Sequence, residues 1–287
     1  MAENIDTLLK ESRVYQPTAQ TKAAAYIQDY ESAYKKSIAD PEGFWSGVAK
    51  ELEWFSPWTK VLEWNYPWAK WFVGATCNIT YNCLDRHVKT WRKNKVAVIW
   101  VGENNEERVI TYGELYRQVN RCANALKKLG IEKGDRVTIY LPKVPEQIVA
   151  MLACARIGAI HSVVYSGFSA PALANRIQDA ESKLVITADV GFDRGKVLNL
   201  KPVVDQAVAN SPSVEHVVVL RRQTPGVSLS TPKEIDWHDW LKNEKAVCEA
   251  EPLDAEHPLY ILYTSGTTGK PKGVVHVHGG YMVGTYI

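Results

Sequence analysis

The strongest constraint on the fold is an alternation of short apolar runs with amphipathic segments between residues 96 and 277. Runs typical of β-strands occupy residues 137–141, 160–165, 184–188 and 217–220, and segments of helical character separate them. Strands that alternate with helices form βαβ units, in which the strands pair in parallel and the helices pack on the sheet. The sequence therefore predicts an α/β domain with a largely parallel sheet and flanking helices.

The clearest helix begins after Thr111, which can form a capping box with Glu114. Apolar residues then recur at helical spacing as far as Gly130, a residue type that commonly ends helices. Further helices are predicted over residues 145–158, 170–180, 200–210 and 237–244, and a last one begins near Gly279.

The first 84 residues differ from the rest and are predicted to form a helical, tryptophan-rich arm. Helical spacing of apolar residues predicts a helix over 18–38, which Asp40-Pro41 would end. Six tryptophans follow between residues 45 and 71. We interpret them as an anchor that buries aromatic area against the main domain. A surface for stacking sugars or bases is disfavoured, because no repeated pattern of basic residues accompanies them.

Composition excludes several classes of function. The 287 residues carry a net charge of only +2, with acids and bases mixed along the chain, so neither nucleic acid nor a membrane surface is an expected partner. Five cysteines without a Cys-x-x-Cys pair are expected to be free thiols in a reducing, cytoplasmic compartment. The sequence shows no signal peptide and no apolar run long enough to span a membrane.

A loop rich in glycine and hydroxyl residues, YTSGTTGKPKG at 263–273, joins the apolar runs 259–263 and 274–277. Glycine allows turns that direct successive backbone N–H groups into one concavity, while hydroxyls and lysines add donors and positive charge. This chemistry suits a polyphosphate, and the alternative is an ordinary solvated hairpin loop. A P-loop is disfavoured, because Gly269 is followed by Lys270-Pro271 and no glycine has the partner that the P-loop motif requires.

The same eleven residues resemble the signature loop of adenylate-forming enzymes, the superfamily of acyl-CoA synthetases, luciferases and peptide-synthetase adenylation domains. The resemblance implies that the loop holds the β- and γ-phosphates of ATP while a carboxylate attacks the α-phosphate. This ATP-binding role carries over to Thr264, Ser265, Gly266, Thr267, Thr268, Gly269 and Lys272.

The arm carries a resemblance of its own. The stretch from Phe44 to His87, and above all NITYNCLDRH at 78–87, is similar to the amino-terminal region of acetyl-CoA synthetases. Luciferases and peptide-synthetase domains lack such an arm. Within the superfamily, the chain therefore resembles the short-chain acyl-CoA synthetases. It implies an arm over residues 1–84 and the amino-terminal part of an adenylation (AMP-binding) domain over residues 85–287.

Two more loops follow predicted strands, where ligands of parallel sheets bind. The loop at 166–169 contains Gly167, which suits either close approach of a ligand or an ordinary helix cap. The stretch at 193–196 follows a predicted strand, is expected to precede a helix, and suits either a phosphate or plain solvation. The resemblance implies contacts with coenzyme A for Asp193, Arg194, Gly195, Lys196 and Gly167, with Asp193 standing where the family commonly has arginine.

No metal site is predicted. His276 and His278 are expected on one face of a strand, but the sequence places no third ligand beside them. The carboxylates show no pairing typical of glycosidases. No residue stands out as a general base, and none is assigned as catalytic.

The resemblance implies an AMP-forming acetate–CoA ligase, which uses ATP, CoA and Mg²⁺ and passes an acetyl group through acetyl-adenylate to CoA. It also implies that the chain is an amino-terminal fragment, inactive alone, with motifs of the family missing after residue 287. A ligase for propionate or another short acid is an alternative. A non-catalytic fragment that complements a second polypeptide is another, and a P-loop phosphotransferase is disfavoured. The sequence alone decides neither the preferred acid nor the oligomeric state.

Overall fold

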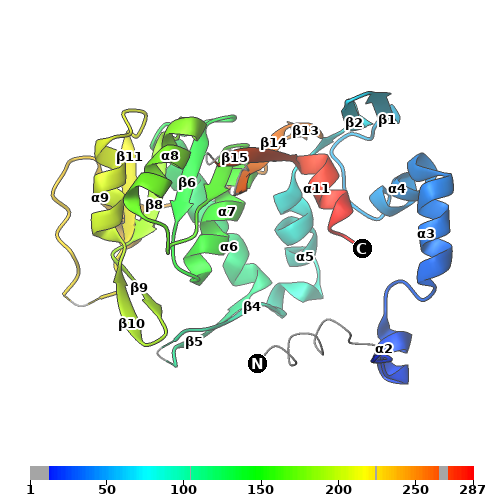
Figure 1. The fold of residues 1–287 in the computed structure, drawn as a ribbon, viewed down its shortest axis with the longest axis horizontal. Helices are drawn as coiled ribbons and strands as arrows, with labels where there is room; N and C mark the ends of the chain where they lie inside the picture. The colour runs from blue at the N-terminus through cyan, green and yellow to red at the C-terminus, as the bar shows by residue number, and fades with distance from the viewer. Residues whose placement is uncertain (1–12, 104, 224, 265–270) are drawn as a thin grey trace, which may run out of the picture.

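A seven-stranded sheet forms the centre of the main domain in the computed structural model, which describes residues 13–103, 105–223, 225–264 and 271–287 (Figure 1). The strand order is β12-β11-β8-β6-β7-β14-β15. Its strands are β6 (Arg136–Tyr140), β7 (Ile160–Val163), β8 (Leu184–Ala188), β11 (His216–Leu220), β12 (Glu234–Asp236), β14 (Pro258–Thr264) and β15 (Lys272–Val277). Every neighbouring pair is parallel except the antiparallel hairpin β14–β15. The predicted α/β fold with a largely parallel sheet is therefore confirmed.

Helices precede, connect and follow the strands of this sheet. They are α6 (Tyr112–Lys128), α7 (Pro145–Ile157), α8 (Ala170–Ala180), α9 (Lys201–Ala209), α10 (Trp237–Leu241) and α11 (His278–Gly284). The chain crosses from β6 to β7 in one direction and from β7 through β8 to β11 in the other. Right-handed crossovers therefore place α7 on one face and α8 with α9 on the opposite face. The sheet is covered on both sides, and every residue of β8 is buried.

The boundaries of several helices follow from capping. The Thr111 hydroxyl accepts a hydrogen bond from the Glu114 N–H at 3.2 Å, as the capping box predicts. α7 begins with Pro145 and ends at Gly158, whose φ of 78° is a left-handed conformation that glycine adopts without strain.

The arm is less helical than predicted. It contains α2 (Ala19–Ala24), α3 (Tyr30–Ala39), α4 (Pro41–Ala49), the hairpin of β1 (Lys60–Asn65) and β2 (Trp68–Val73), β3 (Thr76–Cys77) and most of a π-helix (Tyr81–Asp85). The helix α5 (Arg86–Val88) and a 3₁₀-helix (Trp91–Asn94) follow the arm. The single helix expected over 18–38 is two helices. Ala25 is extended, and the Asp29 carboxylate caps a new helix by accepting from the Ser32 N–H at 3.0 Å.

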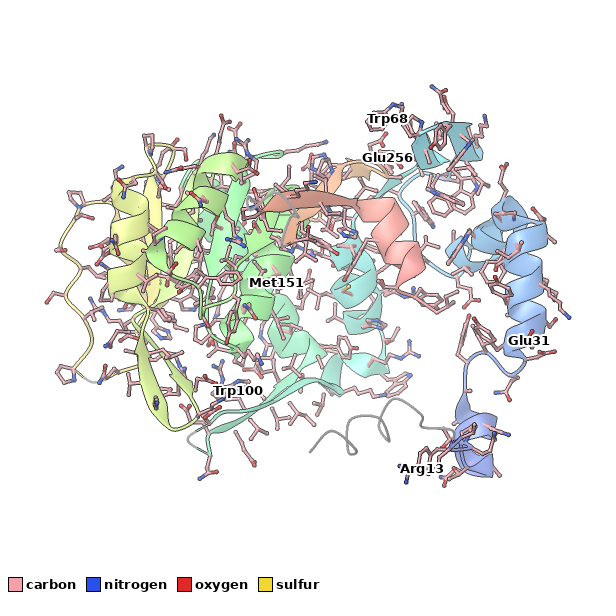
Figure 2. The ribbon with its side chains drawn as sticks, in the orientation of Figure 1. Arg13, Glu31, Trp68, Trp100, Met151 and Glu256 are labelled. Carbon is pink, nitrogen blue, oxygen red and sulfur yellow. The ribbon has the colours of Figure 1, made fainter. Side chains whose placement is uncertain are left out.

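The tryptophans of the arm divide into two groups. Trp45, Trp54, Trp58 and Trp71 pack around buried Phe72 in an apolar cluster that also includes Met282 and Val283 of α11. Trp64 and Trp68 instead lie at the end of the β1–β2 hairpin, where they are 65% and 74% exposed. Figure 2 labels Trp68 there. The predicted anchoring role therefore fits four of the six side chains.

Two antiparallel hairpins outside the main sheet position the site. One is formed by β4 (Val96–Val101) and β5 (Glu107–Thr111), the other by β9 (Val190–Asp193) and β10 (Lys196–Asn199). A further two-stranded pair joins β3 to β13 (Leu253–Asp254). The hairpin β9–β10 was not expected, because it is short and lies directly after β8.

None of the helices within the described ranges has both the length and the apolar composition needed to cross a membrane.

Candidate functional site

A cleft of about 480 Å³ lies beyond the carboxyl ends of β6 and β7. The β4–β5 and β9–β10 hairpins border it, and apolar residues that follow the two strands line it: Leu141, Pro142, Val163 and Val164. Aromatic side chains of Trp100, Tyr165 and Phe192 add to its walls. Trp100 is labelled in Figure 2. This is the edge of a parallel sheet at which ligands bind in α/β proteins.

The predicted loop at 166–169 lies at this cleft, which Tyr165 and Ser166 line. The Tyr140 hydroxyl fixes the loop by donating to the carbonyls of Ser166 and Phe168, at 2.8 and 2.7 Å. Burial raises the pKa of Tyr140 to about 12, so the hydroxyl keeps the proton that it donates. A Cβ at Gly167 would meet the Tyr165 ring at 2.4 Å, so a larger residue there would displace that ring from its place beside the cleft.

The predicted stretch at 193–196 forms the tip of the β9–β10 hairpin. Arg194 and Gly195, with φ of 51° and 72°, are the central residues of a tight turn, and Asp193 pairs with Lys196 across it. The stretch leads into β10, so an unexpected strand lies between it and the predicted helix, which is α9; a turn with two left-handed residues favours a hairpin. All four residues are exposed, and among them only Asp193 lines the cleft.

The glycine-rich loop leaves the sheet at the same edge. Thr264 ends β14 and lies opposite Lys272, which begins β15, and the Thr264 hydroxyl donates to the Lys272 carbonyl at 3.4 Å. Because β14 runs parallel to β7, its carboxyl end points to the side where the cleft lies, and Leu262 of β14 lines that cleft. Ser265, Gly266, Thr267, Thr268 and Gly269 lie outside the described residues.

Tyr263 connects the start of this loop to α8. Its hydroxyl donates to the Asp179 carboxylate at 2.6 Å, and its ring lies 5.6 Å from the Arg176 guanidinium. Burial and then Asp179 raise the pKa of Tyr263 well above its ordinary value. The tyrosine therefore stays protonated and holds the strand end against the helix.

Sequence reasoning missed a group of charged residues around the cleft. The buried Asp189 carboxylate accepts backbone N–H bonds from Val190 at 2.7 Å, Arg222 at 2.8 Å and Gln223 at 3.2 Å. Asp189 thus ties the start of the β9–β10 hairpin to the segment after β11. Arg222 is the second residue after the strand-like run 217–220. The rule that ligands bind beyond strand ends could therefore have indicated it.

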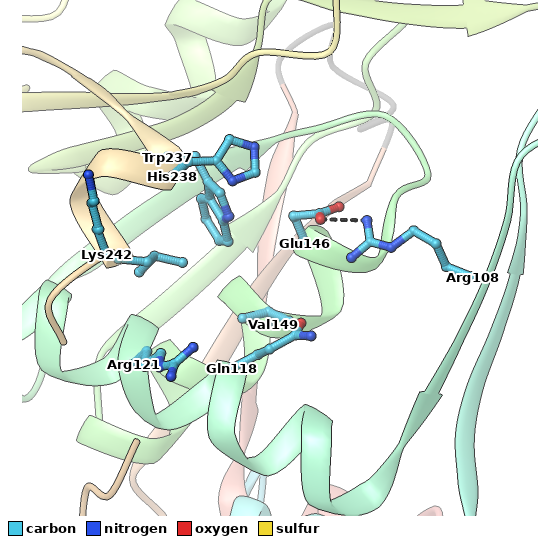
Figure 3. Close-up of a pocket in the computed structure, with 9 residues that line it drawn as sticks. Arg108, Gln118, Arg121, Glu146, Val149, Trp237, His238 and Lys242 are labelled. Atoms are coloured by element: carbon cyan, nitrogen blue, oxygen red, sulfur yellow. Dashed lines mark hydrogen bonds and ion pairs between the residues drawn. The ribbon is translucent and has the colours of Figure 1, made fainter. Parts of the chain in front are cut away.

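A second pocket, of about 290 Å³, lies between α6, α7 and α10 (Figure 3). Arg121, His238 and Lys242 surround it, and Arg108 forms an ion pair with Glu146 at 2.6 Å on one side. Its described lining includes none of the residues that the sequence singled out for ATP or CoA.

The histidines do not form the arrangement that the sequence predicted. His276 lies on β15 and stacks on Tyr260 with ring centroids 4.6 Å apart, whereas His278 begins α11 and is fully buried. The chain turns into a helix at His278, so the two side chains do not share one face of a strand. Within the described residues, no group of three or more His, Cys, Asp or Glu side chains is placed to hold a metal ion.

Comparison with known proteins extends over almost the whole chain. A family model described as "AMP-binding enzyme" matches residues 84–287, and one described as "Acetyl-coenzyme A synthetase N-terminus" matches residues 30–83. The chain is 50% identical to acetyl-coenzyme A synthetase of Deinococcus radiodurans, over 99% of this chain and 44% of that protein. It is 56% identical to acetyl-coenzyme A synthetase of Methanothrix thermoacetophila, over 84% of this chain and 37% of that protein.

A solved structure agrees with these matches. Acetoacetyl-CoA synthetase from Streptomyces lividans superposes with a TM-score of 0.86 and 30% identity, over 95% of this chain and 44% of that chain. The chain spans less than half the length of the relatives that it matches.

Proposed function

The chain belongs to the family of AMP-binding enzymes, and we propose that it acts as the amino-terminal part of an AMP-forming acetate–CoA ligase. One observation carries the proposal. An arm of the acetyl-CoA-synthetase type and an AMP-binding segment follow each other in one chain, which is about half identical to acetyl-coenzyme A synthetases along nearly its whole length.

In the proposed reaction an acetate oxygen attacks the α-phosphorus of ATP and pyrophosphate leaves. The thiol of CoA then attacks the carbonyl carbon of acetyl-adenylate, and AMP leaves with the oxygen that came from acetate. Both steps release stabilised anions, so the protein's main task is to hold phosphates and to balance their charge.

We assign the ATP phosphates to the glycine-rich loop, through Thr264, Ser265, Gly266, Thr267, Thr268, Gly269 and Lys272. The support is that β14 and β15 present the two ends of this loop at the carboxyl edge of the sheet. The described residues offer no cluster of ligands for a metal, so we propose that Mg²⁺ arrives with the ATP phosphates, as it commonly does.

We assign CoA to the cleft between the two hairpins. The support is that Asp193 and the loop before Gly167 meet there, with the aromatic rings of Trp100, Tyr165 and Phe192 available to a nucleotide base. Arg194, Gly195 and Lys196 on the exposed hairpin tip would reach the outer part of such a ligand. We also propose a cytoplasmic location, because all five cysteines are free thiols.

The decisive experiment is acetate-dependent exchange of pyrophosphate into ATP, which requires acetate and ATP but no CoA. It is measured on the 287-residue chain alone, and on a chimera that continues the chain with the remaining part of the Deinococcus radiodurans relative. We expect exchange in the chimera. Exchange by neither protein would contradict the ligase proposal and would favour a non-catalytic fragment.

A separate variant tests the assignment of the ATP phosphates to the glycine-rich loop. Lys272→Ala in the chimera is expected to slow exchange about 10- to 100-fold, because a positive charge at the departing pyrophosphate is lost. Lys35→Ala, on the exposed surface of α3, is the matched control and should leave exchange unchanged. An unchanged rate for Lys272→Ala would mean that this lysine does not bind the phosphates.

The preferred acid is a separate question, because one structural relative is named for acetoacetyl-CoA. We propose acetate, because the more similar relatives are named acetyl-coenzyme A synthetase. Comparing acetate, propionate and acetoacetate as substrates of the chimera should give the highest kcat/KM for acetate. A higher value for another acid would reassign the substrate.

A further inference from the structure

Building on the proposed function, we propose that Arg222 is the phosphate-binding cation of the CoA cleft and that Glu106 holds it in place until CoA binds. The charged side chains that line the cleft are Glu103, Lys143, Asp193 and Arg222. They include two anions and two cations. Binding of a phosphorylated ligand therefore depends on which of the two cations is rigidly placed.

Arg222 is the better placed of the two cations. Its guanidinium carbon lies 4.9 Å from the centre of the Phe192 ring and 5.9 Å from that of Trp100, so two walls of the cleft hold it. Its backbone N–H donates to the buried Asp189 carboxylate at 2.8 Å. The side chain is only 12% exposed. Lys143 is exposed, and its ammonium sits on a flexible stem.

The ionic partner of Arg222 is well suited to being replaced. One guanidinium nitrogen of Arg222 lies 3.0 Å from a Glu106 carboxylate oxygen, and the Glu106 side chain is 48% exposed on the β4–β5 hairpin. An ion pair whose carboxylate is half-exposed contributes little to stability, because water can replace the carboxylate's partner, whereas a guanidinium binds phosphate through several charge-assisted hydrogen bonds. Because the aromatic rings hold the guanidinium, it can change partner without moving far.

The opposite hairpin shows the same pattern in a weaker form. The Gly195 N–H at the tip of β9–β10 donates to the Glu103 carboxylate at 3.4 Å. Carboxylates of the β4–β5 turn therefore occupy two donors, one that lines the cleft and one at the hairpin tip beside it, at positions where phosphate oxygens of a ligand would bind. The Gly195 contact links the two hairpins, and the Arg222 contact links the β4–β5 turn to the segment after β11.

The test is calorimetric titration of the 287-residue chain with CoA, dephospho-CoA and pantetheine, which carries no phosphate. Arg222→Gln is expected to weaken CoA binding about tenfold or more and to leave pantetheine binding unchanged. Glu106→Gln is expected to strengthen CoA binding about two- to fivefold, because the guanidinium no longer has a competing anion. Arg221→Gln is the control, since Arg221 pairs with Asp236 and does not line the cleft.

The direction of the Glu106→Gln effect separates ligand binding from a purely structural role. If the ion pair only held the β4–β5 turn against the segment after β11, Glu106→Gln would weaken binding of CoA and pantetheine alike, which would overturn the proposal. Undetectable CoA binding by the wild-type chain would overturn it as well. Neither result would affect pyrophosphate exchange, which involves no CoA and judges the ligase proposal separately. A loss that is confined to CoA and spares dephospho-CoA would support binding of the 3′-phosphate, and a loss with both would support binding of the diphosphate.

Discussion

Two arginines of this protein each contact a carboxylate and at least one aromatic ring, but they differ in burial. Arg156 lies in the interior, forms two bonds with the Asp85 carboxylate at 2.7 and 2.9 Å, and has its guanidinium 5.3 Å from the Tyr116 ring centre. Arg222 lies at the cleft with a single carboxylate contact and two neighbouring rings. The Arg156 side chain is 1% exposed and that of Arg222 is 12% exposed.

Burial decides what each arginine can do. Around Arg156, a network of buried polar groups joins the arm to the main domain. Its Nε donates to the Cys248 carbonyl at 2.6 Å, and the Asn78 amide donates to the carbonyls of Ala155, Arg156 and Glu251. Removing one partner there leaves the other desolvated and unpaired. Around Arg222, water or a ligand can replace Glu106, so the same chemistry serves binding.

The largest effect should come from breaking the buried pair. Arg156→Met is expected to lower the free energy of unfolding by about 3–5 kcal/mol, because the Asp85 carboxyl group is left in the interior without its partner. Arg222→Met should cost about 1 kcal/mol or less, because the Glu106 carboxylate is half-exposed and water can replace its partner. Urea denaturation measures both values. Equal losses for the two variants would contradict the distinction drawn between them.

The buried histidines extend the comparison to groups that are buried without charge. Burial lowers the pKa of His161 from 6.5 to about 4 and, with His257 and His161 nearby, that of His278 to about 3. The unfolded chain binds protons below pH 6.5 that the folded chain does not bind. The stabilisation is therefore complete above pH 6.5 and is lost as the pH falls toward the folded pKa values. Each histidine should lower the free energy of unfolding by about 2 kcal/mol when the pH falls from 8 to 5.

Unfolding free energies at pH 8 and pH 5 test this expectation. His161→Gln should remove about 2 kcal/mol of the pH dependence, because glutamine does not titrate. His238→Gln, at an exposed position of α10, is the control and should leave the pH dependence as it is. An undiminished pH dependence in His161→Gln would show that His161 is not buried in the neutral form.

The smallest single effect is expected at an exposed tryptophan of the arm, in contrast to a half-buried one. Trp54 is half-buried, lies 5.2 Å from the Trp58 and Phe72 ring centres, and donates to the Ala49 carbonyl at 2.9 Å. Trp54→Ala is expected to cost about 2–3 kcal/mol, less than a fully buried tryptophan. Trp68→Ala should change stability by less than about 0.5 kcal/mol, because that side chain is exposed. Thermal unfolding would refute the anchor if both variants behaved alike.

Local patterns were enough to predict the parts of the fold that depend on burial and capping. The helix 170–180 and the strand 184–188 coincide with α8 and β8, and Thr111 caps α6 as expected. The break at residues 25–29 was missed, because the apolar spacing continues through it and only the Asp29 cap interrupts the helix. The hairpin β9–β10 was missed because its strands have four residues each and its register depends on two left-handed turn residues.

The candidate site was predictable where motifs are contiguous and not where tertiary contacts create it. Thr264 and Lys272 could be indicated from one glycine-rich stretch. Arg222, Glu106 and Asp189 are far apart in the sequence, and only the packing of three loops brings them to one cleft. Nothing in the spacing of these residues indicates that Glu106 and Arg222 pair.

The proposed reaction activates acetate as an adenylate, and transfer of an oxygen isotope is its most direct test. The chimera is supplied with ATP, CoA and acetate labelled with ¹⁸O, and the phosphorus NMR signal of the nucleotide product is recorded. We expect AMP with one ¹⁸O in its phosphate, because AMP leaves with an acetate oxygen when the CoA thiol attacks acetyl-adenylate. Unlabelled AMP, or ADP as the product, would contradict it.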